Sequence, residues 1–280
     1  MPDMDYARLV QDAIDEHRAS PVDLLGIGDA AGENAYLNLA RESYVRTVRD
    51  VDSLFRPGGE GRNILEIGSF LGPVSVALRK IGYGVSALDI PEFQASERLR
   101  ALYARHDIPF AGLNLRLAPL PYAPASFDAV IFCEVMEHWN FNPLPVLQEV
   151  NRVLKTGGYV YIGMPNQAGI ANRMKLLLGS SIHNPVGDFF KQLDRRSNMI
   201  VGLHWREYTQ AEALQLLQRM GFEAAAAYFY IEPVRRDAGL LRKLLRKLVF
   251  SYPPFRPSQV AIGRKVAAAA HDFRQTDATR

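Results

Sequence analysis

The chain has 280 residues, of which 48% are hydrophobic and 22% are charged, and this ordinary globular composition excludes wholesale disorder. No window approaches eighteen consecutive apolar residues, and the acidic N-terminal stretch has no apolar core, so we expect neither a membrane-spanning helix nor a signal peptide. The single cysteine, Cys133, excludes an internal disulfide and a cysteine-built zinc site, which fits a cytoplasmic protein. Net charge is +3, but residues 235–280 carry +8, so this basic segment is either a solvated surface or a contact for an anionic partner.

Residues 1–56 are predicted to be helical, because apolar side chains recur there at three-to-four spacing. The positions that form this stripe are Leu37, Ala40, Tyr44, Val48 and Val51. The breaker "RPGGEG" at 56–61 separates this region from the rest of the chain. We therefore expect an N-terminal helical cap over residues 1–61, followed by the main domain over 62–265.

From residue 62 onward, short and nearly all-apolar strands alternate with helices. Strands are predicted at 63–67, 84–90, 113–117, 126–135, 159–164, 224–231 and 258–264. Helices are predicted at 73–80, 93–105, 143–154 and 210–220, the last opened by a capping box and ended by Gly221. This alternation predicts a doubly wound, mostly parallel, seven-stranded α/β sheet with its ligand crevice at the carboxyl ends of the strands.

Two segments outside this alternation have their own patterns. Residues 165–208, after the fifth strand, are too long for a simple connection, so we expect a lid or an acceptor-binding insert. Residues 239–250 place leucines on one face of a helix and Lys/Arg on the other, so this helix either covers a flank of the sheet or lies in an anionic membrane interface. Residues 266–280 are expected to be a flexible tail.

The turn after the first strand of the sheet argues against a phosphate-bearing ligand. The dinucleotide fingerprint G-x-G-x-x-G begins at Gly68, but its second glycine would fall on Phe70 and its third on Pro73. A side chain at the second position keeps the backbone away from a pyrophosphate, and no P-loop Gly-Lys-Ser/Thr follows. The sequence therefore disfavours NAD, FAD and nucleoside triphosphates.

The residues that remain at this turn predict a nucleoside without phosphates. Asp89 ends the next strand, where an acid can accept hydrogen bonds from both hydroxyls of a ribose. Glu66 precedes Gly68 and Gly72 and can help to hold an ammonium group. S-adenosylmethionine (SAM) combines adenosine, a sulfonium and an amino acid, so it is the predicted cofactor, although both acids could instead be surface carboxylates at strand ends.

Five blocks in a fixed order resemble the class I SAM-dependent methyltransferases, especially the type 11 or quinone-biosynthesis-like group. They are "ILEIGSFLG" (64–72), "VSALDI" (85–90), "LPYAPASFDAVIFCEVMEHW" (120–139), "EVNRVLKTGGYVYIGMPN" (149–166) and "LHWREYTQAEALQLLQRMGF" (203–222). The resemblance covers residues 40–232 and implies a Rossmann-like methyltransferase fold and activity.

The resemblance also implies roles for individual residues around SAM. Glu66, Gly68 and Gly72 would line the methionine and ribose side, and Asp89 would take the ribose hydroxyls. The other expected cofactor contacts are Arg41 (methionine carboxylate), Ile90, Leu117 and Ala118 (adenine), and Cys133 and Glu134 (sulfonium). Two departures from the family are Arg116, where relatives often have an acid, and Phe70, which either touches the cofactor or packs under the first helix of the domain.

The acceptor is expected between the N-terminal helices and the insert. His204 and His138 are the candidate catalytic bases for a hydroxyl acceptor, with a structural role as the alternative for each. Cys133 is interpreted as a small buried hydrophobe rather than a nucleophile. No metal site is expected.

Three functions remain open on the sequence. The first is O-methylation of a small molecule, sugar, glycan or natural product, and the second is methylation of a lipid-linked polyprenyl phenol at a membrane surface. The third is non-catalytic SAM binding. A nucleic-acid partner is not expected, because the chain lacks an aromatic–basic module and the N-P-P-Y type of motif after its fourth strand.

Overall fold

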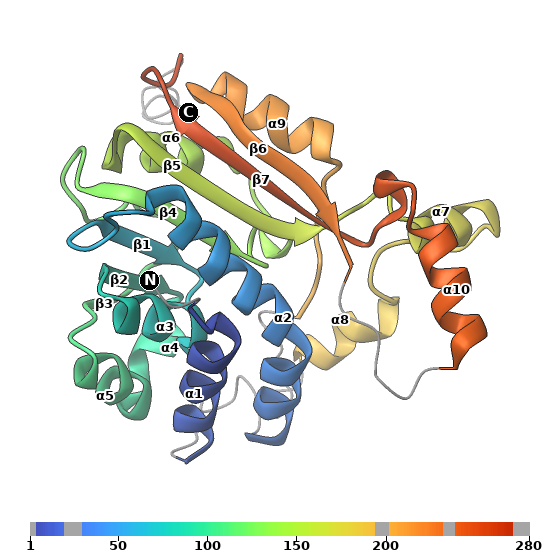
Figure 1. Ribbon diagram of the computed structural model, residues 1–280, viewed down its shortest axis with the longest axis horizontal. Coiled ribbons are helices and arrows are strands. Elements are labelled where there is room, and N and C mark those ends of the chain that lie inside the picture. Colours follow the sequence, from blue (N-terminus) through green and yellow to red (C-terminus); the bar gives the residue numbers. More distant parts are fainter. Residues whose placement is uncertain (1–3, 20–29, 194–201, 232–238, 271–280) are drawn as a thin grey trace.

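The computed structural model describes residues 4–19, 30–193, 202–231 and 239–270, and its centre is a seven-stranded sheet in the order β3-β2-β1-β4-β5-β7-β6 (Figure 1). The strands are β1 Asn63–Ile67, β2 Gly84–Asp89, β3 Phe110–Gly112, β4 Phe127–Cys133, β5 Leu154–Pro165, β6 Phe222–Tyr230 and β7 Ser258–Lys265. Strands β3, β2, β1, β4 and β5 pair in parallel, whereas β7 runs antiparallel to both β5 and β6. The predicted doubly wound, mostly parallel α/β sheet is therefore confirmed.

Helices cover both faces of this sheet (Figure 1). They are α1 Tyr6–Ala19, α2 Ala30–Phe55, α3 Pro73–Ile81, α4 Pro91–Ala95, α5 Glu97–Arg105, α6 Leu144–Val153, α7 Ile170–Leu177, α8 Val186–Leu193, α9 Gln210–Arg219 and α10 Leu240–Val249. Two single 3₁₀ turns, η1 Met136–His138 and η2 Pro253–Phe255, complete the described helical elements.

The side chains of each central strand alternate between two separate apolar cores. Ile64 of β1 and Ile131 of β4 belong to the core beneath α1, α2, α3 and α5. Leu65 and Val130, their neighbours in sequence, belong to the core beneath α6 and α9. Burial on both faces explains why these strands read as continuous apolar runs.

The apolar stripe predicted for the N-terminal region is buried along α2. All five of its predicted inward residues are at most 9% exposed. The helix runs over the face of the sheet at β4 and β5, where the Thr47 hydroxyl lies 3.2 Å from Cys133 Sγ and 3.3 Å from the Tyr161 hydroxyl. The N-terminal part of α2 thereby reaches the carboxyl edge of the sheet.

Two sequence predictions about local structure are wrong. The single helix predicted at 93–105 is two helices, because Ser96 is extended and its hydroxyl accepts the Leu99 amide as the N-cap of α5. The strand predicted at 113–117 is the three-residue β3 at 110–112, followed by a turn. Apolar residues at alternate positions 113, 115 and 117 imitate a strand, but the chain leaves β2 after Gly112.

The predicted insert lies between β5 and α9, and its described part contains α7 and α8; residues 194–201 are outside the described residues. The predicted basic helix is α10, which lies beyond the end of the sheet beside α7 (Figure 1). In the segment predicted as a tail, the amides of Val266 and Ala267 donate to the Gly221 carbonyl, and 271–280 are outside the described residues. Every described helix is too short or too polar to traverse a lipid bilayer.

Candidate functional site

The candidate site lies at the edge of the sheet where β1, β2, β4 and β5 end. The strand order reverses at β1, which pairs with β2 on one side and β4 on the other. Open α/β sheets bind their ligands at such a reversal, outside the carboxyl ends of the strands. Two segments meet there: the loop 68–72 after β1 and the segment 134–138 after β4.

The loop after β1 is a turn that requires glycine at both ends. Gly68 and Gly72 have φ angles of 75° and 83°, in the left-handed region that glycine tolerates best. A Cβ on Gly68 would lie 2.4 Å from a Val135 methyl group, so the segment after β4 packs directly on this turn. The amides of Gly68 and Ser69 donate to the Leu88 carbonyl at 2.8 and 3.2 Å, which fixes the loop to β2.

Phe70 packs between two helices at the centre of this loop. Its φ is 46°, an uncommon conformation for a residue with a side chain. Its ring meets Tyr36 of α2 edge-to-face, with centroids 5.3 Å apart, and Phe93 of α4 at 5.5 Å. Its amide points the other way and donates to Asp89 Oδ2 at 2.7 Å. The structure thus places the Phe70 side chain in helix packing and its backbone on the predicted ribose acid.

Asp89 is held rigidly at the end of β2. Both of its oxygens accept backbone amides at 2.7 Å, Oδ2 from Phe70 and Oδ1 from Ile90. The side chain is buried, and burial raises its pKa to about 6 although the two amide hydrogen bonds act in the opposite direction. A carboxylate has about four lone-pair positions, so each oxygen can accept one further donor, such as a sugar hydroxyl.

Glu66 is buried one residue before β1 ends. It accepts a hydrogen bond from the Ser75 hydroxyl of α3. Burial raises its pKa to about 8, so most of this carboxyl is protonated at neutral pH. A cation placed beside it would lower that pKa, because the ionised form would gain a partner.

The strand β4 ends at the buried thiol of Cys133, and Glu134 follows with a left-handed backbone conformation. Burial raises the pKa of the Cys133 thiol, and Thr47 donates to its sulfur, so this cysteine is a packed, inert group. Glu134 follows with φ at 55°, and its amide donates to the Gly163 carbonyl. The Tyr230 hydroxyl of β6 donates to Glu134 Oε1 at 3.2 Å. A residue with a side chain in the left-handed region is typical of a functional turn.

Glu137 in η1 is buried close to Glu134. It is 1% exposed, and within the described residues no donor bonds to its carboxyl oxygens. Burial, and then the charge of Glu134, raise the pKa of Glu137, and burial also raises that of Glu134. Burial and the repulsion between the two acids therefore both favour the protonated form of Glu137.

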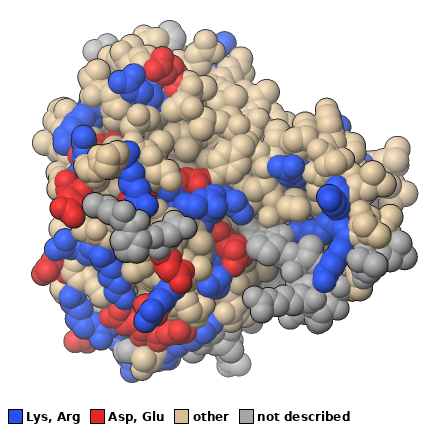
Figure 2. Space-filling model, in the orientation of Figure 1, with Lys and Arg blue, Asp and Glu red and all other residues tan. Residues whose placement is uncertain are grey.

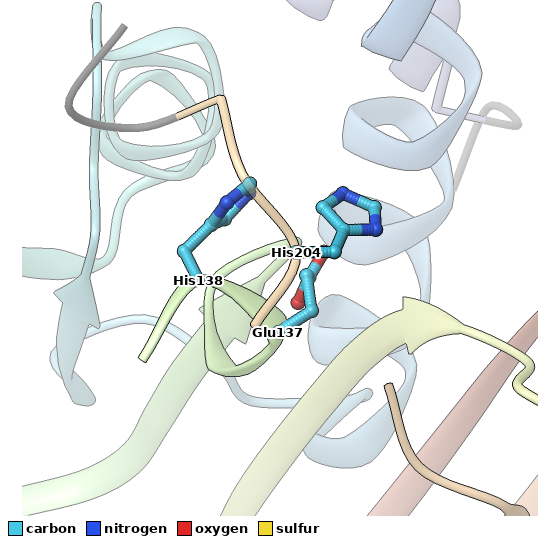
Figure 3. A group of neighbouring side chains, drawn as sticks. All are labelled: Glu137, His138 and His204. Carbon is cyan, nitrogen blue, oxygen red and sulfur yellow. The ribbon is translucent and has the colours of Figure 1, made fainter. Parts of the chain in front are cut away.

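His138 is held in its neutral form beside these acids. Its Nδ1 lies 3.0 Å from the Leu203 carbonyl oxygen, which can only accept, so Nδ1 carries the proton and Nε2 is an acceptor. Burial, and then the nearby His204, lower the pKa of His138 to about 4. Figure 3 shows His138 and Glu137 on the turn after β4 and His204 on the segment that passes over it.

His204 comes from the end of the insert and is oriented by a carboxylate. Its Nδ1 lies 2.9 Å from Glu207 Oε1, and its ring centroid lies 5.0 Å from that of His138. Burial alone would raise the pKa of Glu207, but hydrogen bonds from His204 and Asn172 and the charge of Lys175 lower it overall. An ionised Glu207 holds the Nδ1 proton and leaves Nε2 as a base.

The family that matches this chain covers the residues of the loop after β1, the end of β2 and the segment after β4. A family model described as a methyltransferase domain matches residues 65–162. This segment of the chain is therefore similar to a methyltransferase domain. The match runs from β1 through β5 and includes Glu66, Asp89 and the segment after β4.

Relatives of this methyltransferase domain have related names. A "Probable S-adenosylmethionine-dependent methyltransferase" from Mycolicibacterium smegmatis is 28% identical over 193 residues, which are 69% of this chain and 64% of that protein. A "Ubiquinone biosynthesis O-methyltransferase" from Xanthomonas campestris is 29% identical over 112 residues, which are 40% of this chain and 46% of that protein. The chain thus spans less than two thirds of the length of these curated relatives.

Solved structures share the fold. The 1,6-didemethyltoxoflavin-N1-methyltransferase of Burkholderia thailandensis superposes with a TM-score of 0.54 at 15% identity, covering 95% of this chain and 93% of that one. A SAM-dependent methyltransferase from Mesorhizobium loti gives 0.52 at 16% identity, covering 80% and 98%. The predicted Rossmann-like methyltransferase fold is therefore confirmed.

The residues at the switch point fit SAM, the cofactor expected from the sequence. Asp89 has free acceptor positions for a ribose diol, and Glu66 has a carboxyl that can ionise when a cation comes near. Phe70 fills the position where a pyrophosphate would need bare backbone. The individual contacts predicted for SAM remain predictions.

Arg41 lies in α2 and joins it to α1. Its guanidinium donates to Gln11 Oε1 at 2.7 Å and to the Ala7 carbonyl at 3.2 Å, both in α1. It also pairs with Glu42. These contacts lie within the N-terminal helices, and the predicted role of Arg41 toward the methionine carboxylate stays a prediction.

The two predicted adenine contacts, Leu117 and Ala118, do not lie on a strand. Both amides donate to the Asn114 carbonyl, so the chain forms a turn there, and Leu117 is 76% exposed. The predicted strand at 113–117 is therefore wrong, because the strand of this region is β3, which ends at Gly112. Arg116, which lies in the same turn, is exposed.

Three residues at the site were missed by sequence reasoning. Tyr36 packs on Phe70 from α2, and Tyr230 reaches Glu134 from β6. Glu207 orients His204, whereas the sequence suggested only a structural pairing of Glu207 with Arg206 or the core. Only Glu207 had a usable signal, since it stands three residues after His204 in the block that resembles the family.

The same acceptor-side cluster could also hold a cation. Ligand atoms of Glu137, His138 and His204 lie within 4.8 Å of one another. Imidazole nitrogens and carboxylate oxygens are ordinary ligands of zinc and related metals. No metal was expected from the sequence, so the geometry adds a second interpretation of these side chains, which a chelator can test.

A surface hollow of about 930 Å³ lies elsewhere, between α9 and the start of β6. Phe222 at its wall begins β6, and Val266 follows the end of β7. It is therefore at the opposite edge of the sheet from Asp89 and His204, and it is not part of the candidate site.

Proposed function

We propose that this chain transfers the methyl group of SAM to a hydroxyl oxygen of a small-molecule acceptor, such as a sugar, a phenol or another natural product. The observation that carries the proposal is the His204–Glu207 pair, which provides an oriented base on the insert side of the methyltransferase domain. A hydroxyl needs such a base because it must lose its proton during methylation. The ubiquinone biosynthesis O-methyltransferases among the relatives support an oxygen acceptor.

SAM supplies an electrophilic methyl group, and the residues of this chain bind and align the two reactants. Asp89 would hold the ribose hydroxyls, and the glycine turn would place the remainder of the cofactor toward the end of β4. Alignment of the acceptor oxygen with the methyl carbon supplies much of the rate enhancement in such a reaction. His204 Nε2 would accept the hydroxyl proton, and Glu207 would stabilise the imidazolium that results.

The neighbouring groups leave His204 as the candidate base. His138 has a pKa lowered to about 4, so it is a weak base, but its Nε2 can accept a hydrogen bond from the acceptor. Burial raises the pKa of Glu134 and of Glu137, which favours their uncharged forms and limits the negative charge near the reacting atoms.

Two alternative functions are compatible with the same fold and differ from the proposal in the acceptor or in the absence of catalysis. A lipid-linked acceptor is favoured by the exposed leucine face of α10. A non-catalytic protein that binds SAM is suggested only by the departures at Phe70 and Arg116. A cytoplasmic location also stays a prediction, based on the single cysteine.

Calorimetry and a labelling screen test the proposal together. SAM and its demethylated product should both bind the full chain in calorimetry. Radiolabelled SAM should then label a component of aqueous or lipid fractions of a cell extract, and mass spectrometry should place the methyl group on oxygen. Absence of SAM binding would refute catalysis by this chain, whereas an N-methylated or C-methylated product would refute the hydroxyl acceptor alone.

A further inference from the structure

Exposed apolar side chains concentrate in the helices α7, α8 and α10 and the residues up to Tyr252, which we call the lobe. Of the seventeen large hydrophobic residues that are exposed in the described part of the chain, seven lie in 174–190 and five in 244–252. Figure 1 shows α7 and α10 projecting beyond the end of the sheet. Scattered exposed hydrophobics are normal, but a concentration of this kind marks a contact surface.

Three leucines of α10 whose side chains the structure describes do not cover the sheet. Leu244 and Leu245 are 55% and 53% exposed, and Leu248 is 71% exposed. In α6, by contrast, the apolar face lies in the core, with Leu147 and Val150 fully buried. The interpretation that α10 covers a flank of the sheet is therefore not supported by these exposures.

The charge of the lobe identifies what could cover this face. Residues 239–250 contain four Lys/Arg and no Asp/Glu, and α7 adds Arg173 and Lys175. α8 has one acid, Asp188, and one lysine, so the three helices together are basic. On the face drawn in Figure 2, the projecting part of the molecule shows Lys and Arg among residues of other kinds. A helix with leucines on one side and cations on the other lies well in the interface of an anionic bilayer, with leucines among the acyl chains and cations at the phosphates.

We propose that the lobe of α7, α8 and α10 docks on a membrane surface that contains anionic phospholipid. A second copy of this chain fits less well, because a symmetric contact would bring the same basic residues of α10 together. The apolar and basic features of the lobe are both satisfied by one partner only if that partner is apolar and anionic.

Docking would bring the acceptor side of the site to the bilayer. The Phe189 ring of α8 lies 5.7 Å from the ring of Trp205, which is the neighbour of His204 in the chain. If the proposed function holds, an amphiphilic acceptor could therefore reach His204 directly from the lipid. The docking itself does not depend on methyl transfer, so the two can fail separately.

Vesicle co-sedimentation of the full chain tests this proposal. Vesicles of phosphatidylcholine with 30% phosphatidylglycerol should bind the protein, whereas pure phosphatidylcholine should bind it about tenfold less, and high salt should weaken the binding. The double substitution Leu244→Ser and Leu248→Ser should lower binding about tenfold. Leu39→Ser is the matched control, because Leu39 is 78% exposed on α2 and lies outside the lobe.

The other outcomes overturn the proposal. No binding to either vesicle would refute docking, and unchanged binding by the double variant would move the contact away from α10. Equal binding to both vesicles would refute the anionic preference. If the wild type forms a dimer and does not bind vesicles, and the double variant is a monomer, the lobe is a surface for self-association. SAM calorimetry on each variant shows whether a loss comes from the lobe or from the methyltransferase site.

Discussion

The cofactor side and the acceptor side of the site are built in different ways. On the cofactor side, Asp89 is held by the amides of Phe70 and Ile90, and Glu66 by Ser75, so every partner lies within one strand–turn–helix–strand segment. On the acceptor side, His138, His204 and Glu134 depend on η1, the insert and β6. Local assembly can be inferred from a motif, whereas long-range assembly has to be seen in the folded chain.

The largest effect is expected on the acceptor side, from His204→Ala. Without the base, kcat should fall about 10²–10⁴-fold, while the Kd for SAM stays nearly unchanged. Steady-state kinetics with the acceptor found in the screen, together with calorimetry, measure both quantities. His183→Ala removes an exposed histidine of the insert and is the control. Equal turnover of both variants would remove His204 from the mechanism.

A substitution on the cofactor side should give the complementary result. Asp89→Asn should raise the Kd for SAM about 10- to 100-fold, because hydrogen bonds to a charged acceptor are lost. Calorimetry measures the Kd, and circular dichroism checks that the substitution has not unfolded the domain. Glu92→Gln, an exposed acid just after Asp89, is the control and should bind SAM normally. Normal SAM affinity in Asp89→Asn would contradict the assignment of the ribose site.

Glu207→Gln should have a smaller effect, because Glu207 acts through His204. We expect kcat to fall about tenfold while the Kd for SAM stays unchanged, since the imidazolium that forms loses its carboxylate partner. Glu207→Asp keeps a carboxylate beside His204 and should restore part of the activity. Equal loss of turnover in Glu207→Gln and Glu207→Asp would show that Glu207 only supports the fold of the insert.

The buried acid of β1 should make stability depend on pH. The pKa of Glu66 is about 8 in the folded chain and about 4.3 when unfolded, so between these values the folded state holds a proton that the unfolded state has released. The free energy of unfolding should therefore fall as pH rises from 5 to 8. Glu66→Gln should remove this loss, so that its Tm relative to the wild type rises by about 5 °C over that range.

Thermal unfolding by circular dichroism at pH 5, 6.5 and 8 measures this difference. Glu60→Gln, an exposed acid before β1, serves as the control and should follow the wild type at every pH. Parallel curves for wild type and Glu66→Gln would show that Glu66 is ionised throughout the range.

A chelator should have the smallest effect. If His204 acts as the base, EDTA should leave kcat unchanged, because no ion takes part. Metal analysis of the purified protein gives an independent reading. A loss of activity that zinc or magnesium restores would instead assign the three side chains to a metal site and would remove His204 as the base.

Parts of the fold and site could be predicted because their signals are local. The glycines of the loop 68–72, the acid at the end of β2 and the capping box Thr209–Glu212 each act within a few residues, and the structure has the turn, the strand end and the helix start where they were expected. The prediction failed where local patterns were ambiguous. Alternating leucines suggested a strand at 113–117, and Ser96 was not recognised as a cap inside an apolar helical pattern.

The sequence by itself determined the alternation of strands and helices, the glycine turn and the kind of ligand that this turn rejects, because periodicity and backbone freedom are properties of neighbouring residues. The tertiary structure alone decided that Phe70 packs between α2 and α4, that Glu207 orients His204, and that α10 exposes its leucines. These outcomes depend on which distant surfaces meet. An apolar helix face in a sequence predicts only that another surface packs on it. The tertiary structure decides whether that surface belongs to the same chain.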